Sequence, residues 1–455
     1  MTRKIKKVKP ARQSEHFSCE IDVAIVGLGY VGLPLALQFA RSGCQVLGLD
    51  TDHGKVLDLT AGRSYILHVP AKDIAAQVKS RRFLVTSDVS LIHDAEAIVI
   101  CVPTPLNKNR EPDISYILKT GEAIAPYLRV ESGRQEVEGV KRKKLVVLES
   151  TTYPGTTDEN LKIVLEKGSG LKAGIDFHLA FSPEREDPGN PQSKVAEIPK
   201  VVGGLTPACL ERALELYGKA IRKLVPVSST RAAEATKLME NIFRSVNIAL
   251  VNELKVIYGS MGIDIWEVIE AAKTKPFGFM PFYPGPGLGG HCIPIDPFYL
   301  TWKAREYGHA TRFIELAGEI NTAMPEFVVQ KVADALNHIG RSLRGSKILL
   351  LGVAYKADVD DERESPSFVL IEKMEAKGAE VLFYDPLVPV IRPSREHPKL
   401  AGRKSVNIDT PSDLVLIATA HGPFKAYNFS KLSVPLVDTR NCVAPPNRPK
   451  LYFQA

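Results

Sequence analysis

The stretch IDVAIVGLGYVGLPLALQFARSG, residues 21–43, decides the fold. Its first seven residues are mostly apolar and predict a buried strand, and LPLALQFARSG predicts a helix that ends at Gly43. Between them lies GLGYVG, with Gly27, Gly29 and Gly32 in the G-x-G-x-x-G pattern. The first glycine of this pattern permits a tight turn, the second lets a pyrophosphate approach the backbone, and the third lets helix and strand pack closely. The stretch therefore predicts the first unit of a dinucleotide-binding domain.

An acid follows at the position that this motif needs. QVLGLD, residues 45–50, predicts a second strand that ends in Asp50, where a carboxylate accepts hydrogen bonds from the adenosine ribose and repels a 2′-phosphate. The start of the helix offers free N–H groups to the phosphates. A glycine turn without a ligand is the alternative, and the ordered strand, helix and acid argue against it. We expect NAD, bound by the set Gly27, Gly29, Tyr30, Val31, Gly32, Asp50, Lys55 and Thr104.

Further along the chain, the patterns predict two α/β domains with helices between them. AEAIVICVPTP (95–105) and KLVVLESTT (144–152) predict more strands of a doubly wound parallel sheet. Residues 205–275 have apolar positions at helical spacing over a long run, which predicts a helical middle section with a long central helix and a subunit contact. SKILLLGVAYK (346–356) then returns to the strand–glycine pattern. The predicted fold is two Rossmann-like domains joined by a helical domain.

Composition excludes several classes of function. The 455 residues carry a formal charge of +7, but six basic residues lie in MTRKIKKVKPAR (1–12), and without them the charge is +1. A nucleic-acid role therefore loses its support. We find no secretory signal pattern, no apolar run of the ~20 residues that span a bilayer, and no zinc-ligand spacing among six scattered cysteines. We expect a cytoplasmic protein without a metal and without a membrane partner.

Two segments receive no chemical role from the sequence. ESGRQEVEGVKRKK (131–144) is charged and has no periodic apolar face, which predicts an exposed loop or helix extension. LYFQA (451–455) partly resembles the remnant of a protease site.

Several polar residues stand where ligands bind in open α/β sheets. Thr104 in VPTP and Thr151 in ESTTYPGTT follow predicted strands, where they either orient a ligand or cap a turn. Glu184 in FSPEREDPGNP is either a base or a solvated loop carboxylate. Lys237 and Asn241 are four residues apart on one helical face, where they could stabilise an oxyanion, although a helical lysine is more often surface charge.

The segment PGPGLGGHCIPIDP (284–297) surrounds one thiol, Cys292, with turn-forming residues. A thiol in such an open loop is accessible, and a thiolate is a strong nucleophile. Together with NAD, it suggests that an alcohol is oxidised through an aldehyde and a thioester to an acid. Asp296 could assist the thiol or the hydrolytic water, and a structural cysteine remains the alternative.

Seven motifs resemble one family in their order along the chain: GLGYVGLPLA, VPTP, ESTTYPGTT, SPEREDPG, EATKLMENIFR, GPGLGGHCIPIDP and LGVAYKADVDDERESPS. Residues 20–442 resemble the UDP-glucose/GDP-mannose dehydrogenase family, and they are most similar to its branch that oxidises UDP-N-acetylhexosamines. The resemblance implies an NAD-binding domain at 20–204, a helical dimerisation domain at 205–325 and a UDP-sugar-binding domain at 326–455. The basic residues that precede them predict a disordered tail at 1–19.

The resemblance also implies the roles of individual residues. The nucleophile falls on Cys292, and the other catalytic positions fall on Lys237, Asn241, Asp296, Glu184 and Thr151. The implied substrate-binding set is Arg185, Arg244, Gly289, Lys356 and Arg440. One position departs from the family pattern, because the second glutamate of UDP-glucose enzymes is here Pro188. This departure argues against glucose and leaves hydrolysis to Glu184, Asp296 or water held by Thr151.

We therefore expect a four-electron oxidation of the C6 hydroxymethyl of UDP-N-acetylglucosamine to a carboxylate, for a surface polysaccharide, by a homodimer or higher homo-oligomer. The same chemistry on UDP-N-acetylgalactosamine, UDP-N-acetylmannosamine or UDP-glucose is the first alternative. A one-step NAD dehydrogenase with a structural cysteine is the second. A non-catalytic nucleotide-binding regulator is the third, although it has little reason to keep Lys237, Asn241, Cys292 and Asp296 together.

Overall fold

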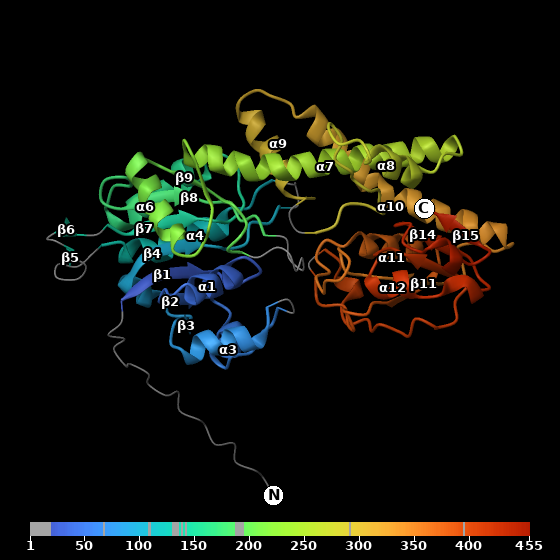
Figure 1. Ribbon diagram of the computed structural model, residues 1–455, viewed down its shortest axis with the longest axis horizontal. Helices are drawn as coiled ribbons and strands as arrows, with labels where there is room; N and C mark the ends of the chain where they lie inside the picture. The colour runs from blue at the N-terminus through green and yellow to red at the C-terminus, as the bar shows by residue number, and fades with distance from the viewer. Residues whose placement is uncertain are drawn as a thin grey trace, which may run out of the picture.

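The computed structural model of the chain describes residues 20–66, 69–107, 111–129, 136–137, 140–141, 143–186, 195–290, 293–394 and 396–455. Two α/β domains lie side by side, and a long helix runs across them (Figure 1). This arrangement confirms the predicted fold class. The predicted tail at 1–19 lies outside the described residues.

The first domain is built on an eight-stranded sheet of order β10-β9-β8-β7-β4-β1-β2-β3. Its neighbouring strands are parallel except for β8 and β9, which are antiparallel. The strands are β1 (Ile21–Val26), β2 (Val46–Leu49), β3 (Phe83–Thr86), β4 (Ala95–Ile100), β7 (Leu145–Leu148), β8 (His178–Phe181), β9 (Lys200–Gly204) and β10 (Leu224–Val227). The helices are α1 (Gly32–Arg41), α2 (His53–Thr60), α3 (Ala71–Lys79), α4 (Ser115–Ile124), α5 (Lys162–Ser169) and α6 (Pro207–Gly218). A π-helical turn at Thr156–Leu161 leads into α5.

Both faces of this sheet are buried, as its parallel strands require. In β1, Val23 and Ile25 join the hydrophobic core on one face, and Ala24 and Val26 join the core on the other. The sheet continues past residue 204, where the sequence placed the end of the domain, because α6 packs against β8 and β9 and leads into β10.

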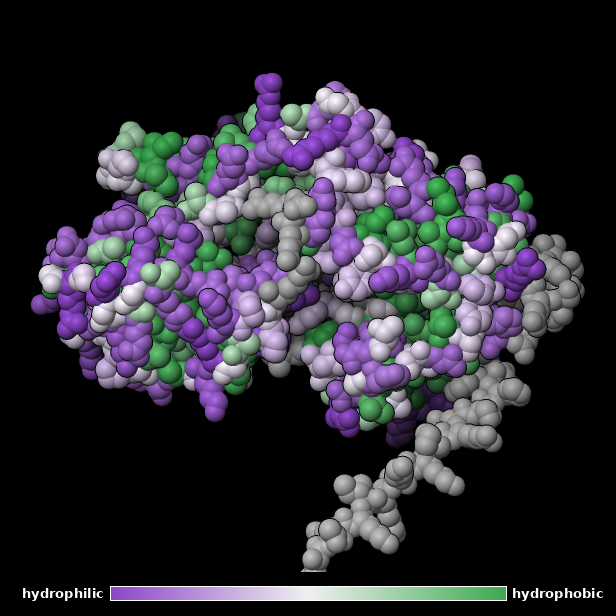
Figure 2. Space-filling view, turned by 180° about the vertical axis from the view of Figure 1, so that it is seen from behind, coloured by the Kyte–Doolittle hydropathy of each residue, from purple (hydrophilic) through white to green (hydrophobic). Residues whose placement is uncertain are grey.

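The middle of the chain consists of four helices: α7 (Thr230–Ser260), α8 (Ile265–Ala272), α9 (Asp296–Glu306) and α10 (Arg312–His338). The long helix α7 has 31 residues, begins at the Ser229 side-chain cap, and packs along α10, which leads into the second α/β domain. Seen from behind, the surface shows two lobes with a hollow between them (Figure 2). Helices α7 and α10 therefore fix the two sheets relative to each other.

The second α/β domain has a five-stranded parallel sheet of order β12-β11-β13-β14-β15. Its elements are β11 (Lys347–Leu351), α11 (Pro366–Ala376), β12 (Glu380–Tyr384), β13 (Leu414–Ile417), α12 (Gly422–Ala426), β14 (Leu436–Asp438) and β15 (Tyr452–Gln454). It repeats the start of the first domain, because Gly352 has a φ of +88° at the end of β11 and Asp385 follows β12. Asp385 accepts the Val353 N–H at 2.7 Å, much as Asp50 accepts the Leu28 N–H at 2.9 Å.

Two sequence interpretations need correction. LYFQA has a place in the second sheet, because β15 pairs in parallel with β14 and Ala455 is only 1% exposed. In the segment 131–144, the described residues form the small antiparallel pair β5 (Glu136–Val137) and β6 (Val140–Lys141), and Lys144 is buried. The Lys144 ammonium donates to the carbonyls of Ile92 and Ala95, which explains how a charged residue can occupy the core edge.

Candidate active site

The glycine turn after β1 has the geometry that the motif predicts. Gly27 has a φ of +94°, and a Cβ there would lie 2.6 Å from the Cys101 carbonyl oxygen. A Cβ on Gly32 would overlap the Gly27 carbonyl. By contrast, a Cβ on Gly29 would meet no described atom within 4 Å. Gly27 and Gly32 therefore serve packing, and Gly29 leaves the backbone open on the side where a pyrophosphate binds.

Asp50 lies at the end of β2, where the ribose of a dinucleotide binds. It is buried, accepts the N–H groups of Leu28 and Asp52 at 2.9 Å each, and has the Lys55 ammonium 3.4 Å away. Val31 immediately precedes α1, so the free N–H groups of this helix face the same turn. These residues fit NAD, with Asp50 toward the ribose and the turn toward the pyrophosphate.

Arg363 is a residue that the sequence did not assign. Its guanidinium carbon lies 4.2 Å from the centre of the Tyr30 ring, across the cleft between the two α/β domains. A cation in this place faces the glycine turn, where a pyrophosphate would carry negative charge. The only sequence signal was its place in LGVAYKADVDDERESPS.

Four predicted catalytic residues come together beneath the cleft. On α7, Lys237 donates to the Glu184 carbonyl at 2.6 Å and lies 3.3 Å from the Glu184 carboxylate. One turn later, Asn241 donates to the Asp296 carboxylate at 2.6 Å. Since Glu184 follows β8 and Asp296 begins α9, three separate segments meet at this face of α7.

Burial shifts the protonation of this group. Asp296 is only 2% exposed, and desolvation raises its pKa to about 7. The Lys237 charge and the Asn241 hydrogen bond act in the opposite direction and lower this pKa, whereas the Glu184 charge raises it further. Glu186, which the sequence did not single out, donates its N–H to the Glu184 carboxylate. Desolvation and the Glu184 charge raise the Glu186 pKa to about 8. The pKa values of two carboxyl groups are thus raised toward neutral pH, the range that acid–base catalysis uses.

A second unassigned glutamate joins α7 to the threonine-rich loop after β7. Glu234 is fully buried and accepts the N–H groups of Gly155 and Thr157 at 2.7 and 2.9 Å and the Thr157 hydroxyl at 2.7 Å. It lies three residues before Lys237 and so holds the segment with Thr151, which is half-buried, against the catalytic helix. Thr104 is buried, and its carbonyl accepts the Tyr299 hydroxyl of α9.

Cys292 lies outside the described residues, as does Pro188, but the glycines around Cys292 are described. A Cβ on Gly289 would lie 3.0 Å from both Pro366 and Tyr355, and a Cβ on Gly290 would lie 2.9 Å from the Tyr355 ring. The loop therefore needs glycine because it packs directly on the second α/β domain.

The predicted substrate-binding residues fall into two groups. Arg440 and the half-buried Lys356 lie in the second α/β domain; Arg440 donates to the Ala418 carbonyl at 3.1 Å, and burial lowers its pKa to about 10. The Arg185 guanidinium forms an ion pair with Glu240 at 2.6 Å and donates to the Pro199 carbonyl at 2.7 Å. Arg244 is exposed on α7, one helical turn after Asn241.

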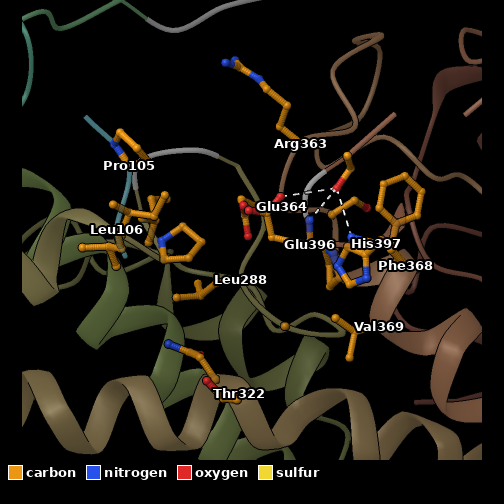
Figure 3. A pocket seen from close by; sticks show the side chains of 18 of the residues that line it. Pro105, Leu106, Leu288, Thr322, Arg363, Glu364, Phe368, Val369, Glu396 and His397 are labelled. Atoms are coloured by element: carbon orange, nitrogen blue, oxygen red, sulfur yellow. Dashed lines mark hydrogen bonds between the residues drawn. The ribbon is translucent and has the colours of Figure 1, made fainter. Parts of the chain in front are cut away.

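A cavity of about 930 Å³ opens beside this group, between the three parts of the chain. Figure 3 shows Pro105 and Leu106 from the first domain, Leu288 and Thr322 from the middle, and Arg363, Glu364 and Phe368 from the second α/β domain around it. Ile295 and Pro297, which flank Asp296, also line the cavity. The cavity thus extends from Tyr30 in the glycine turn to the residues on either side of Asp296.

The described residues contain no helix with the length and apolarity that a bilayer crossing requires. Within the same ranges, no group of His, Cys, Asp and Glu side chains could hold a metal ion.

Comparison with known proteins gives a consistent result over the whole chain. Residues 21–221, 231–323 and 349–445 match the NAD binding, central and UDP binding domains of the UDP-glucose/GDP-mannose dehydrogenase family. The chain is 35% identical over 421 residues to UDP-N-acetyl-D-glucosamine 6-dehydrogenase of Pseudomonas aeruginosa, with 91% of this chain and 94% of the relative covered. It is 33% identical over 431 residues to UDP-N-acetyl-D-mannosamine dehydrogenase of Pyrococcus horikoshii, with 93% and 96% covered.

Solved structures agree. The UDP-N-acetylmannosamine dehydrogenase structure from Pyrococcus horikoshii superposes with a TM-score of 0.82 at 31% identity, covering 95% of this chain and 99% of that one. A UDP-glucose dehydrogenase from Pyrobaculum islandicum also superposes with a TM-score of 0.82, at 25% identity and with 96% and 98% covered. With the glycine turn, the Lys237–Asn241 group and all three domains in place, the chain belongs to the UDP-glucose/GDP-mannose dehydrogenase family, as an NAD-dependent UDP-sugar dehydrogenase.

Proposed function

We propose that this dehydrogenase oxidises the C6 hydroxymethyl of UDP-N-acetylglucosamine to a carboxylate, which supplies an aminouronic acid for a surface polysaccharide. The observation that carries the proposal is the meeting of Lys237–Glu184 and Asn241–Asp296 on one face of α7, next to the loop that contains Cys292. The relative named for this substrate supports it at 35% identity.

The reaction consumes one water and delivers two hydrides and three protons for each alcohol converted to carboxylate. NAD, held at the glycine turn and Asp50, supplies the hydride acceptor. In the first stage Lys237 and Asn241 hold the substrate oxygen, and Asp296, with its pKa near 7, accepts the hydroxyl proton as C6 loses a hydride.

The second stage depends on the thiol. The Cys292 sulfur adds to the aldehyde carbon, and the resulting thiohemiacetal loses the second hydride and becomes a thioester. Water attacks the thioester carbon, its proton passes to the Glu184–Glu186 pair, and the Cys292 thiolate leaves. Glu186 then takes the part that a glutamate at position 188 has in the UDP-glucose branch, since here that residue is proline.

The stoichiometry of NADH and acid tests this chemistry. We expect two NADH per uronate from the wild type and a loss of acid formation of at least ~10³-fold in Cys292→Ala, because the thioester cannot form. Cys44→Ala, which changes a buried cysteine of the first core, is the matched control and should keep the ratio of two. One NADH per product, or undiminished acid from Cys292→Ala, would favour the one-step dehydrogenase with a structural cysteine.

Kinetics with several UDP-sugars tests the choice of sugar. Relatives named for UDP-N-acetyl-D-mannosamine and for NDP-N-acetyl-D-galactosaminuronic acid are each 33% identical to this chain. The kcat/KM values for the UDP derivatives of N-acetylglucosamine, N-acetylmannosamine, N-acetylgalactosamine and glucose, measured side by side, decide among them. A value at least tenfold higher for an N-acetylglucosamine epimer would replace the proposed substrate.

We further propose that the enzyme acts in the cytoplasm as a homodimer joined along α7. The apolar residues Met239, Phe243, Leu250 and Ile257 are exposed and recur at helical spacing on this helix. Lys237 and Asn241 lie on the opposite side of the helix, so a second copy could cover the apolar stripe without closing the site.

A further inference from the structure

Lys255, near the end of α7, is a buried cation that the reaction described above does not use. The side chain is only 6% exposed, and its ammonium nitrogen has no hydrogen-bond partner among the described residues. The nearest ring is that of Phe327 on α10, whose centre is 5.8 Å from the nitrogen. A buried donor without an acceptor is unfavourable, and more so when it is charged, so its presence calls for an explanation.

The charges that face Lys255 make the arrangement less favourable still. Burial first, and then the Arg440 charge, lower the Lys255 pKa to about 7; Lys331 on α10 also lowers it, and Asp438 at the end of β14 raises it. Asp438 is engaged elsewhere, because it accepts the N–H groups of Arg440 and Cys442 at 2.9 and 2.8 Å. Lys255 and Arg440 are therefore two cations that act on each other, and Asp438, the carboxylate that acts on Lys255 in the described part of the chain, already has partners.

The same face of α7 organises the glycine-rich loop. Asn252, one turn before Lys255, accepts the Gly285 N–H at 3.0 Å and donates to Asn321 of α10 at 2.9 Å. A Cβ on Gly285 would overlap the Arg440 guanidinium, so Arg440 lies directly against the loop backbone. The end of the catalytic helix, the glycine loop and the family's UDP-binding domain thus converge where Lys255 and Arg440 lie.

We propose that Lys255 completes the nucleotide site from the central domain, donating its ammonium to a diphosphate oxygen of the bound UDP-sugar next to Arg440. A diphosphate carries the negative charge that the two cations lack, and charge-assisted hydrogen bonds to it replace the missing acceptor. The inference rests on the chain's use of a UDP-sugar and adds a residue that anchors the nucleotide half, whichever hexosamine is the substrate.

Binding of UDP-N-acetylglucosamine, measured by calorimetry in the absence of NAD, tests the inference. We expect Lys255→Met to raise the Kd by about 10- to 100-fold, as the loss of one charge-assisted hydrogen bond predicts. Lys255→Gln keeps a hydrogen-bond donor without the charge, and its Kd should lie between those of the wild type and Lys255→Met. Lys331→Met is the control. The Lys331 ammonium lies 5.5 Å from the centre of the same Phe327 ring, and its removal should change the Kd by less than about threefold.

The pH dependence distinguishes an anchoring lysine from a merely structural one. The diphosphate diester does not titrate near neutrality, whereas free Lys255 loses its proton as the pH rises through its lowered pKa. Above that pKa, ligand binding must take up a proton, so the affinity advantage of the wild type over Lys255→Met should shrink between about pH 6 and pH 8.5.

Stability supplies an independent readout. The folded chain disfavours the charged form of Lys255, so burial of this charge lowers the stability of the fold. The loss of stability is complete below the lowered pKa of Lys255 and disappears as the pH approaches the ordinary pKa of lysine. Ligand-free Lys255→Met should therefore melt at a higher temperature than the wild type at about pH 6.5. A more stable variant with an unchanged Kd would overturn the inference, as would a Lys331→Met variant that loses as much affinity. Failure of the wild type to bind any UDP-sugar would overturn the proposed function as well.

Discussion

At the scale of the residue, Asp296 is one of the carboxyls of the site whose pKa lies near neutral pH. Its carboxyl is buried beside Asn241, and its pKa is raised to about 7 from an ordinary value of 3.8. The folded chain therefore binds a proton that the unfolded chain has already released. The stability contributed by the protonated form is complete below about pH 4 and is lost as the pH rises to about 7.

Asp296→Asn should therefore be more stable than the wild type, and increasingly so at higher pH. We expect the difference in unfolding free energy to widen by about 2 kcal/mol between pH 5 and pH 8, while kcat falls by about 10²- to 10⁴-fold because an amide cannot accept the proton. Urea unfolding at the two pH values and a steady-state assay measure both effects. Asp334→Asn, an exposed change on α10, is the control, and a gap that is equal at both pH values would contradict the buried carboxyl.

The residues whose surroundings could be predicted from the sequence are those held within one local motif. Gly27, Gly32 and Asp50 belong to one β-α-β unit, so their geometry follows from a motif of about 30 residues. Lys255 and Glu234 were missed because a lysine or glutamate in a helix is ordinarily exposed, and only the packing of α7 shows that both are buried. Arg363 was missed because its neighbour Tyr30 is 333 positions away in the chain.

At the scale of the element, the C-terminal strand β15 is one that the sequence pattern did not predict. Its three residues are too few for a recognisable alternation, and its partner β14 lies across an irregular connection. Yet it fixes the edge of the second sheet: the Tyr452 hydroxyl donates to the Asp438 carboxylate at 3.0 Å, and Gln454 donates to Asp264, the cap of α8, at 3.2 Å. Asp438 in turn holds the backbone of Arg440.

Deletion of residues 451–455 should consequently destabilise the second α/β domain and weaken substrate binding. We expect the melting temperature to fall by about 5 °C or more and the KM for the UDP-sugar to rise, because the edge of β14 and the Asp438 carboxylate lose their partners. Calorimetry and initial rates measure these effects. Gln454→Ala keeps the strand and should lower the melting temperature by less than half as much. A deletion variant with the same melting temperature as the wild type would contradict a structural role for residues 451–455.

At the scale of the whole molecule, the candidate site is formed by residues from all three domains. The glycine turn and Glu184 come from the first domain, Lys237, Asn241 and Asp296 from the middle, and Arg363 and Arg440 from the second α/β domain. The predicted order of domains followed from strand and helix patterns, but the meeting of Glu184 with Lys237 spans 53 positions, and only the resemblance suggested it. The same helix α7 carries the catalytic face and the exposed apolar stripe.

The assembly along α7 can be tested by placing charge in that stripe. Leu250 and Ile257 are 49% and 46% exposed, two helical turns apart, and a second copy that covers them would bury apolar area at each. The double variant Leu250→Glu/Ile257→Glu should therefore convert a dimeric wild type to monomers, since buried carboxylates without partners are strongly unfavourable. Light scattering after size exclusion measures the mass. Ile163→Glu, on a residue of α5 that is 58% exposed, should leave the dimer intact. A wild type that is monomeric at micromolar concentration, or a double variant that stays dimeric, would place the subunit contact elsewhere.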